Sequence, residues 1–89
     1  MSNIWGLDVQ QVRQLGTSLD QEADSIDQTI SKLTGVLNNT QWTGPDATQF
    51  RNDWTGAHTS SLRKVSQALR EVAQQARTNA QAQEQTSQS

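Results

Sequence analysis

The side chains best suited to catalysis lie in one short segment, where His58 is followed by Ser60 and Ser61. A histidine beside a serine can activate a hydroxyl nucleophile, but that chemistry also needs an orienting acid and an oxyanion hole. Positions two and three residues apart on a plain helix supply neither. The chain has no cysteine and no second histidine, so the usual metal ligands are missing. We therefore expect no enzyme activity, no metal and no cofactor, and we expect His58 to be a hydrogen-bonded interior residue.

A second charged cluster is acidic and lies in the first half of the chain. It consists of Asp20, Glu22, Asp24 and Asp27. One interpretation is a solvated helix face. The alternative is a docking surface for basic residues of the same or a second chain, namely Arg63, Lys64 and Arg70.

The composition limits the partners and predicts a dimer. A net charge of −2 argues against nucleic acid, which calls for a basic patch. No apolar run is long enough to span a bilayer, and residues 1–6 lack the basic and apolar regions of a secretory signal peptide. We thus expect no stable membrane insertion, and composition alone favours the cytoplasm. Hydrophobic residues are 31% of an 89-residue chain without disulfides, so oligomerisation is the remaining common source of stability.

A helix-breaking stretch, residues 41–46, divides the chain near its middle. Gly44 and Pro45 break helix, and Pro45 suits the first turn of a following one. Trp42 is the unusual residue, because a large aromatic beside a tight turn has no obvious core to enter. Either it holds the turn onto the hairpin or it is offered to a partner.

The first helix is predicted over residues 8–38. Asp8 is a suitable N-cap, Gln11 occupies the capping-box position, and Leu7 with Val12 can form a hydrophobic staple. Apolar residues recur at steps of three and four along one stripe. They are Val12, Leu15, Leu19, Ala23, Ile26, Ile30, Leu33 and Leu37. Gly16 and Gly35 lie inside this helix at a cost of about 1 kcal/mol each relative to alanine, and either can mark a close approach of two backbones.

The second helix is predicted over residues 45–78, after a turn at 39–44. Its stripe consists of Ala47, Phe50, Trp54, His58, Leu62, Val65, Leu69, Val72 and Ala76. Gly56 and the neighbouring Thr and Ser residues weaken helix propensity, so we expect an irregularity over 55–61. Residues 79–89 are too polar to offset the entropy of ordering and are predicted to be a flexible tail.

Folding the two helices back on each other predicts an all-α, antiparallel helix-turn-helix hairpin in a single domain. Pairing positions whose numbers sum to about 84 places Asp20 opposite Lys64 and Arg13 opposite Glu71. Two such hairpins, packed as a four-helix bundle, would cover the large residues that one hairpin leaves at its margins. The residues expected in the hairpin or dimer core are Leu15, Leu19, Ile26, Ile30, Leu33, Leu37, Leu62, Val65, Leu69 and Val72.

The turn and the residues after it follow a W-x-G-x-x-A-x-x-F pattern, formed by Trp42, Gly44, Ala47 and Phe50. With its central position, the chain length and the two stripes, this pattern resembles the WXG superfamily of small ESAT-like proteins of bacterial type VII secretion systems. Trp54 and His58 also look like those of actinobacterial members. The resemblance covers nearly the whole chain.

The resemblance implies a hairpin that pairs antiparallel with itself or with a related WXG protein. It also implies export of the folded dimer, without a cleaved signal peptide, by a complex driven by an FtsK-like ATPase. The protein would act outside the cell or at its surface by binding other proteins. Trp42 and Gly44 match the turn motif that contributes to recognition by the secretion machinery, and Ala47, Phe50 and Trp54 match its flanking core.

The family's second recognition element, a C-terminal Y-x-x-x-[DE] motif, is incomplete, because the chain has no tyrosine. Ala80 and Glu84 are the residual match, with alanine in place of the aromatic residue. This departure favours a heterodimer in which a related protein supplies the complete motif. A cytosolic helical-bundle adaptor or structural dimer remains the alternative, since the two stripes alone would support it equally well.

Overall fold

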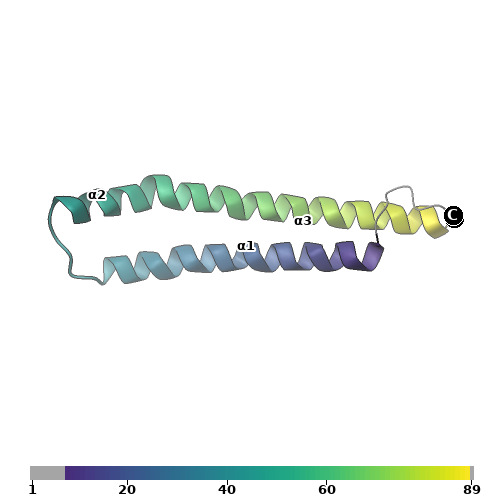
Figure 1. The fold of residues 1–89 in the computed structure, drawn as a ribbon, viewed down its shortest axis with the longest axis horizontal. Coiled ribbons are helices and arrows are strands. Elements are labelled where there is room, and N and C mark those ends of the chain that lie inside the picture. The colour runs from purple at the N-terminus through teal and green to yellow at the C-terminus, as the bar shows by residue number, and fades with distance from the viewer. Residues whose placement is uncertain (1–7, 89) are drawn as a thin grey trace.

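The computed structural model describes residues 8–88, which form an extended helical hairpin. Helix α1 (Val9–Asn38) runs the length of one arm, and the second arm consists of α2 (Pro45–Asp53), a π-helical turn (Trp54–His58) and α3 (Thr59–Gln88). The arms lie side by side and join at one end (Figure 1). The Cα trace measures 66 × 17 × 13 Å. Helical hairpin architecture is thus confirmed, and the helices begin and end at the predicted turn.

The N-terminal cap of α1 is the predicted one. The backbone N–H of Gln11 donates to Asp8 Oδ1 at 3.0 Å, which satisfies one of the unpaired donors of the first turn. The proposed staple partner Leu7 lies outside the described residues, and Val12 is half-buried.

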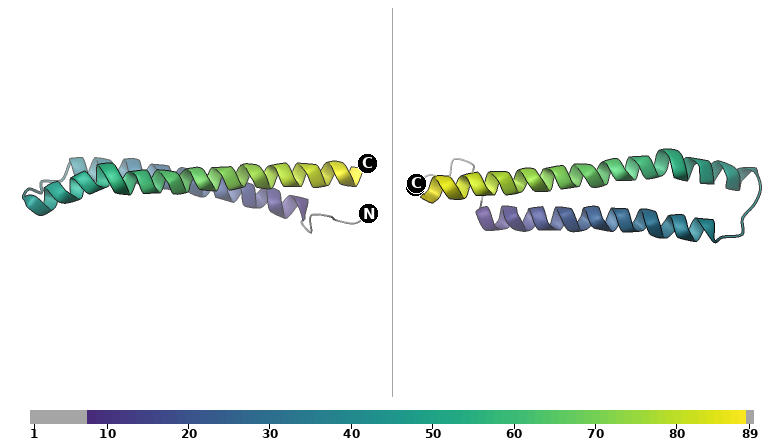
Figure 2. Two further views of the ribbon diagram at one scale, coloured as in Figure 1. Left: turned by 90° about the horizontal axis from the view of Figure 1, so that it is seen from above. Right: turned by 180° about the vertical axis from the view of Figure 1, so that it is seen from behind.

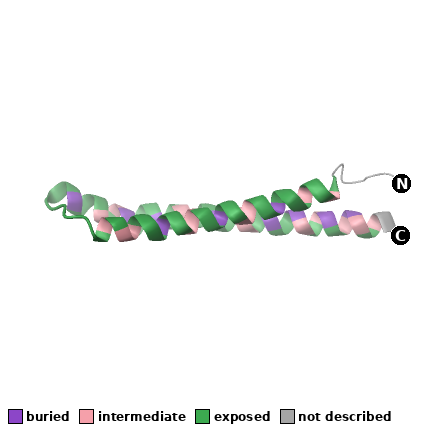
Figure 3. Ribbon diagram, turned by 90° about the horizontal axis from the view of Figure 1, so that it is seen from below, coloured by how far each residue is buried: buried purple, intermediate pink, exposed green. Residues whose placement is uncertain are grey.

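The two arms meet along a seam of mostly small residues, at which they cross at a shallow angle (Figure 2). On α1 the buried residues recur every seven positions, and on α3 a matching series does the same (Figure 3). The seam consists of Gly16, Ala23 and Ile30 on α1 and of Thr59, Ser66, Ala73 and Ala80 on α3. Seven-residue spacing is the repeat that keeps two helices in contact along their length.

Close backbone approach explains one of the two glycines of α1. A Cβ on Gly16 would lie 3.3 Å from the carbonyl oxygen of Ala73, so the helices approach most easily where no side chain intervenes. A Cβ on Gly35 would meet nothing within 4 Å. Ser66 adds a hydrogen bond across the seam, because its hydroxyl donates to the Ala23 carbonyl at 3.3 Å.

The π-helical turn confirms the expected irregularity and corrects the placement of His58. A π turn inserts an extra residue into the helical repeat. As a result Trp54 and Thr59, five residues apart, both face α1 and are buried, whereas His58 is exposed. The predicted interior histidine is therefore wrong.

The predicted register was also wrong. Gly16 lies against Ala73, and Ser66 bonds to Ala23, so facing positions sum to about 89 rather than 84. The turn and the extra residue of the π turn together place more chain between the two packed segments than a tight hairpin would. Asp20 consequently pairs with Arg77 rather than with Lys64. Arg13 pairs with Glu84 rather than with Glu71.

The predicted flexible tail is helical, because α3 continues to Gln88. Polar composition does not prevent order here, because small residues are enough to continue a seam of small residues. Ala80 is fully buried and Gln83 is buried beside it. An ion pair from Arg13 to Glu84, at 2.7 Å, adds a further contact between the start of α1 and the end of α3.

Candidate protein-binding surface at the turn

The turn depends on one glycine. Gly44 adopts φ +117° and ψ 173°, a conformation that side-chain-bearing residues rarely take. Pro45 then opens α2, where its missing N–H removes no helical hydrogen bond, and Asp46 lies in the first turn, where the helix dipole favours a negative charge. The structure thus assigns Gly44 the backbone role that the sequence suggested.

Arg51 holds the turn together, and the sequence analysis missed it. Its guanidinium donates to the carbonyl oxygens of Trp42 at 2.6 Å, Thr40 at 3.0 Å and Leu37 at 3.4 Å. The Leu37 carbonyl is one of the last four of α1, which have no i→i+4 helical donor, and it also accepts the Thr40 N–H at 3.3 Å. A basic residue near a helix C-terminus is a known way to satisfy such carbonyls. The only sequence clue was an arginine within reach of the turn.

Three aromatic side chains form a row from the turn into the hairpin. The Trp42 and Phe50 ring centroids lie 6.0 Å apart, and those of Phe50 and Trp54 lie 6.4 Å apart. Trp54 is 8% exposed, and its Nε1 donates to Thr34 Oγ1 at 2.9 Å. Trp42 therefore does pack onto the hairpin, through Phe50, yet it remains 42% exposed.

The motif-flanking residues separate into buried and exposed positions. Ala47 is fully buried and Trp54 is buried, as expected of a core. Phe50 is 41% exposed, so its assignment to the core does not hold for the single hairpin. Because α2 diverges from the end of α1 (Figure 1), the ring of Phe50 covers Trp54 from the solvent side instead of entering the seam.

Next to the aromatic row lies an apolar pocket between the last turns of α1 and the second arm. Its volume is about 170 Å³. The lining residues are Leu33, Val36, Leu37, Thr40, Phe50 and Trp54. We call it the turn pocket. Its only hydroxyl, Thr40 Oγ1, donates to the Val36 carbonyl, so the pocket offers little besides apolar contact.

Farther from the turn, one face of the hairpin is polar, and ion pairs along it connect the two arms. Four ion pairs connect α1 with α3. Three of them join residues that lie four positions after a seam residue or after Val9, which continues the seven-residue spacing of the seam on α1. They are Arg13–Glu84, Asp20–Arg77 and Asp27–Arg70, with Asp24 as a second partner of Arg70. Three of the four residues of the acidic cluster, Asp20, Asp24 and Asp27, thus pair with arginines of their own chain. Of the three basic residues that the docking alternative named, Arg70 takes part in these ion pairs.

Hydrogen bonds across this polar face shift two pKa values. The Ser66 hydroxyl and then the Arg70 guanidinium lower the pKa of Asp27 below its usual range. Asp24 and then Asp27 raise the pKa of Arg70. The side chains of Asp24, Asp27 and Arg70 are 40–66% exposed, so their ion pairs add little to the stability of the fold. Their main effect is to specify which faces of α1 and α3 meet.

The opposite face is apolar. Each residue turns the helix by about 100°. A residue four positions after a seam residue therefore lies on one side of the seam, and a residue three positions after it lies on the other side. Since the ion-paired flanks of α1 and α3 share one face, the apolar flanks must share the other. This apolar face consists of Val12, Leu15, Leu19, Ile26, Leu33 and Val36 on α1 and of Leu62, Val65, Leu69 and Val72 on α3.

Most of the expected core residues lie on this apolar face and are only partly covered by the hairpin. Ile30 alone among them is buried, at 4% exposure, in the seam. Five are half-buried, namely Leu19, Ile26, Leu37, Leu62 and Leu69. Four are exposed, namely Leu15, Leu33, Val65 and Val72. The hairpin thus offers a row of large apolar side chains to solvent, interrupted on α1 by Glu22 and Thr29.

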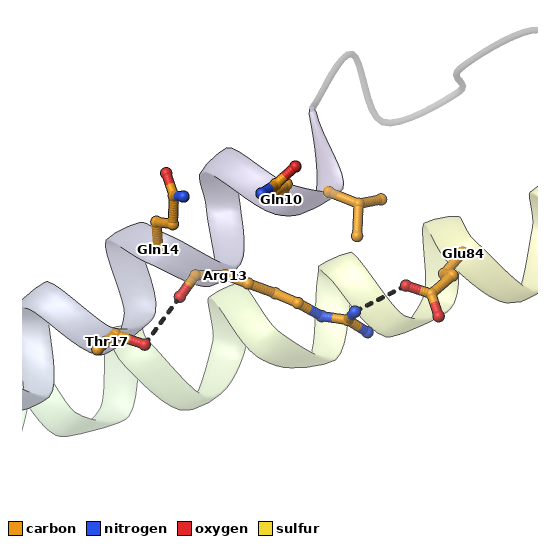
Figure 4. A pocket seen from close by; sticks show the side chains of 6 residues that line it. Gln10, Arg13, Gln14, Thr17 and Glu84 are labelled. Atoms are coloured by element: carbon orange, nitrogen blue, oxygen red, sulfur yellow. Dashed lines mark hydrogen bonds and ion pairs between the residues drawn. The ribbon is translucent and has the colours of Figure 1, made fainter.

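The residual C-terminal match lies at the far end of the hairpin from the turn. Ala80 is buried in the seam, and Glu84 extends toward Arg13 across an open polar groove (Figure 4). Val9, Gln10, Gln14 and Thr17 line the same groove. In this arrangement Ala80 is covered, whereas the Glu84 carboxylate is paired with Arg13 and stays 43% exposed.

Within residues 8–88 nothing indicates a metal centre or a membrane span. No group of three or more His, Cys, Asp or Glu is placed to hold a metal ion in this part of the chain. None of its helices is both long enough and apolar enough to cross a bilayer. His58, Ser60 and Ser61 are all exposed on the outer side of the second arm.

The fold and this surface together define a helical hairpin with one polar, ion-paired face and one exposed apolar face that ends at an aromatic turn. Comparison with protein-family models, curated proteins and solved structures finds no match to this chain.

Proposed function

We propose that this protein is a substrate or co-secreted partner of a type VII secretion system and that it acts by protein–protein binding. The observation that carries the proposal is the turn. Trp42 is 42% exposed at the tip of the hairpin, Gly44 has the positive φ that its place in the motif requires, and Arg51 hydrogen-bonds to the Trp42 carbonyl. These features support the W-x-G resemblance, because a W-x-G tripeptide that occurs by chance does not require this turn geometry.

The proposal includes pairing with a second hairpin. Apolar patches of this extent on a soluble chain mark interaction sites. An antiparallel partner laid on the apolar face would bury Leu15, Val65 and Val72 and form a four-helix bundle. The partner is a second copy or a related WXG protein, and the absent tyrosine favours the related protein. The FtsK-like ATPase of the secretion system is the second partner in this proposal.

Export is the test. The chain is expressed with its secretion locus, and the culture filtrate is compared with the cytosol in cells with and without a functional secretion ATPase. Replacing Trp42 with arginine should reduce export while leaving the helix content by circular dichroism unchanged. Thr43→Arg is the matched control, because it adds the same charge at the neighbouring exposed position and should be exported normally. Equal amounts in the filtrate with and without the ATPase would refute the proposal.

A cytosolic adaptor or structural dimer is the second candidate, and one observation favours it. The residual C-terminal match is occupied within the hairpin, since Ala80 is buried and Glu84 pairs with Arg13. The export assay separates the two candidates, because the adaptor would stay in the cytosol and would tolerate Trp42→Arg whenever pairing is retained.

A further inference from the structure

The turn pocket is large enough to receive an apolar side chain, and the hairpin itself leaves it open. Its wall includes Phe50, which is 41% exposed, and Val36, which is 56% exposed. The turn pocket lies at the end of the apolar face nearest the turn. A partner that covers this face would therefore contact the pocket only with one of its own ends. The occupant must therefore come from the end of whatever covers the face.

The same sequence contains a segment of matching chemistry. Residues 1–7 carry Ile4, Trp5 and Leu7 and no charged side chain. They lie outside the described residues, directly before the cap residue Asp8. A tryptophan with two aliphatic neighbours is what an uncharged pocket lined by leucine, valine and aromatic side chains would bind.

This segment cannot reach the turn pocket of its own chain. The start of α1 and Leu33 are separated by about 38 Å at 1.5 Å of rise per residue. Seven residues span at most about 25 Å when fully extended. An occupant from residues 1–7 must then belong to another molecule.

Antiparallel pairing of two copies would place residues 1–7 of one copy beside the turn pocket of the other. The apolar face on α1 runs from Val12 to Val36, so full overlap of two copies centres the pair near residue 24. Thr40 of one copy then lies opposite Asp8 of the other. The segment before Asp8 starts at the mouth of the turn pocket.

We propose that residues 1–7 of a second copy of this chain cover the turn pocket, with the Trp5 side chain inserted beside Phe50 and Trp54. This inference rests on the pairing proposed above and makes it more specific. Pocket and segment occur in one sequence, which favours a second copy over the related protein that the missing tyrosine favours. Each dimer contains the contact twice.

The first test is the dissociation constant of the 89-residue chain by sedimentation equilibrium. Trp5→Ala should weaken the dimer at least about 30-fold, as expected of a buried aromatic anchor. Asn3→Ala, a polar neighbour in the same segment, is the matched control and should leave the constant unchanged. Circular dichroism checks that both variants keep the helices of the wild type.

The second test uses the absence of cysteine. Gly6→Cys chains are mixed with Thr40→Cys chains and oxidised, and a disulfide-linked dimer is expected. Gly6→Cys mixed with Ser25→Cys is the control, because Ser25 lies near the middle of α1 and about 25 Å from the expected position of the segment. Preferential linkage to Thr40 together with the loss of affinity supports the inference.

Failure takes two distinguishable forms. If the wild-type chain dimerises but Trp5→Ala has no effect, or if the linkage shows no preference for Thr40, this inference is wrong and the proposed pairing stands. A wild-type chain that stays monomeric refutes pairing with a second copy, and this inference with it. The export assay then decides the proposed function independently.

Discussion

Replacing Arg51 with methionine tests whether the turn is held by a side chain rather than by its own backbone. The guanidinium donates to the carbonyls of Trp42, Thr40 and Leu37 at 2.6, 3.0 and 3.4 Å. Methionine keeps a long, flexible side chain of similar helix propensity, so the loss is confined to these hydrogen bonds.

The magnitude follows from those three bonds. A hydrogen bond to a charged group contributes about 1.5–3 kcal/mol when it is well formed and shielded. Trp42 and Thr40 are exposed, so water replaces much of what their carbonyls lose, and the contact to Leu37 is near the limiting length. We expect a loss of about 1–2 kcal/mol in the free energy of unfolding.

The assay is thermal unfolding followed by circular dichroism at one fixed chain concentration, since pairing would make the midpoint depend on concentration. For a domain of this size the expected loss lowers the Tm by roughly 5–15 °C. Arg51→Lys should recover only part of the loss, because one ammonium cannot replace a planar fork that spans three acceptors. Arg63→Met, on the same arm but away from the turn, is the control.

A Tm for Arg51→Met within about 2 °C of the wild type would refute the reasoning, because it corresponds to less than about 0.5 kcal/mol. Near-UV circular dichroism adds a local measurement. If Arg51 fixes the Trp42 backbone, the tryptophan signal of Arg51→Met should weaken at temperatures where the far-UV spectrum is still that of the folded hairpin.

Three further predictions concern backbone and charge. Gly35→Ala should raise the free energy of unfolding by about 0.5–1 kcal/mol, whereas Gly16→Ala should not, because its Cβ would lie 3.3 Å from the Ala73 carbonyl; parallel urea titrations compare them. Gly44→Ala should cost about 1–3 kcal/mol because of its φ of +117°, and an unchanged urea midpoint would contradict this. The lowered pKa of Asp27 stabilises the fold above the unfolded-state value near 3.9, and this stabilisation disappears as the pH falls through the folded-state pKa. Asp27→Asn should therefore reduce the loss of Tm on acidification, measured between about pH 7 and pH 2.

The parts of the fold that local chemistry controls could be predicted from the sequence. Asp8 caps α1, Pro45 opens α2, and Gly44 makes the turn, each for a reason that involves only neighbouring residues. Helix periodicity likewise predicted two long amphipathic arms. For the site, the two stated alternatives for Trp42 were a residue that holds the turn onto the hairpin and a residue offered to a partner. Its ring packs against Phe50, which agrees with the first, and the partner role stays a prediction.

The register and the turn contacts could not be predicted, because they depend on how two separated segments meet. The π turn shifts by one residue which side chains of the second arm face α1, so Thr59 rather than His58 lies at the seam. Arg51 reaches carbonyls nine to fourteen residues earlier in the chain, which no helical period indicates. On α3, the apolar period could not indicate the seam, because Thr59, Ser66 and Ala73 are small or polar.

The choice of seam also explains why the large apolar residues remain outside it. Each helix carries small residues flanked on one side by leucine, isoleucine and valine and on the other by ion-pairing groups. Packing the leucine stripes against each other would separate Asp27 from Arg70 and Asp20 from Arg77. Packing the small residues keeps both pairs, but it buries little apolar surface for a chain of this length. A hairpin built in this way is poorly stabilised alone, and a second hairpin on the apolar face would supply the missing burial. The seam of small residues allows the ion pairs to form but leaves the apolar face uncovered. It is therefore the strongest structural reason for the dimer that we propose.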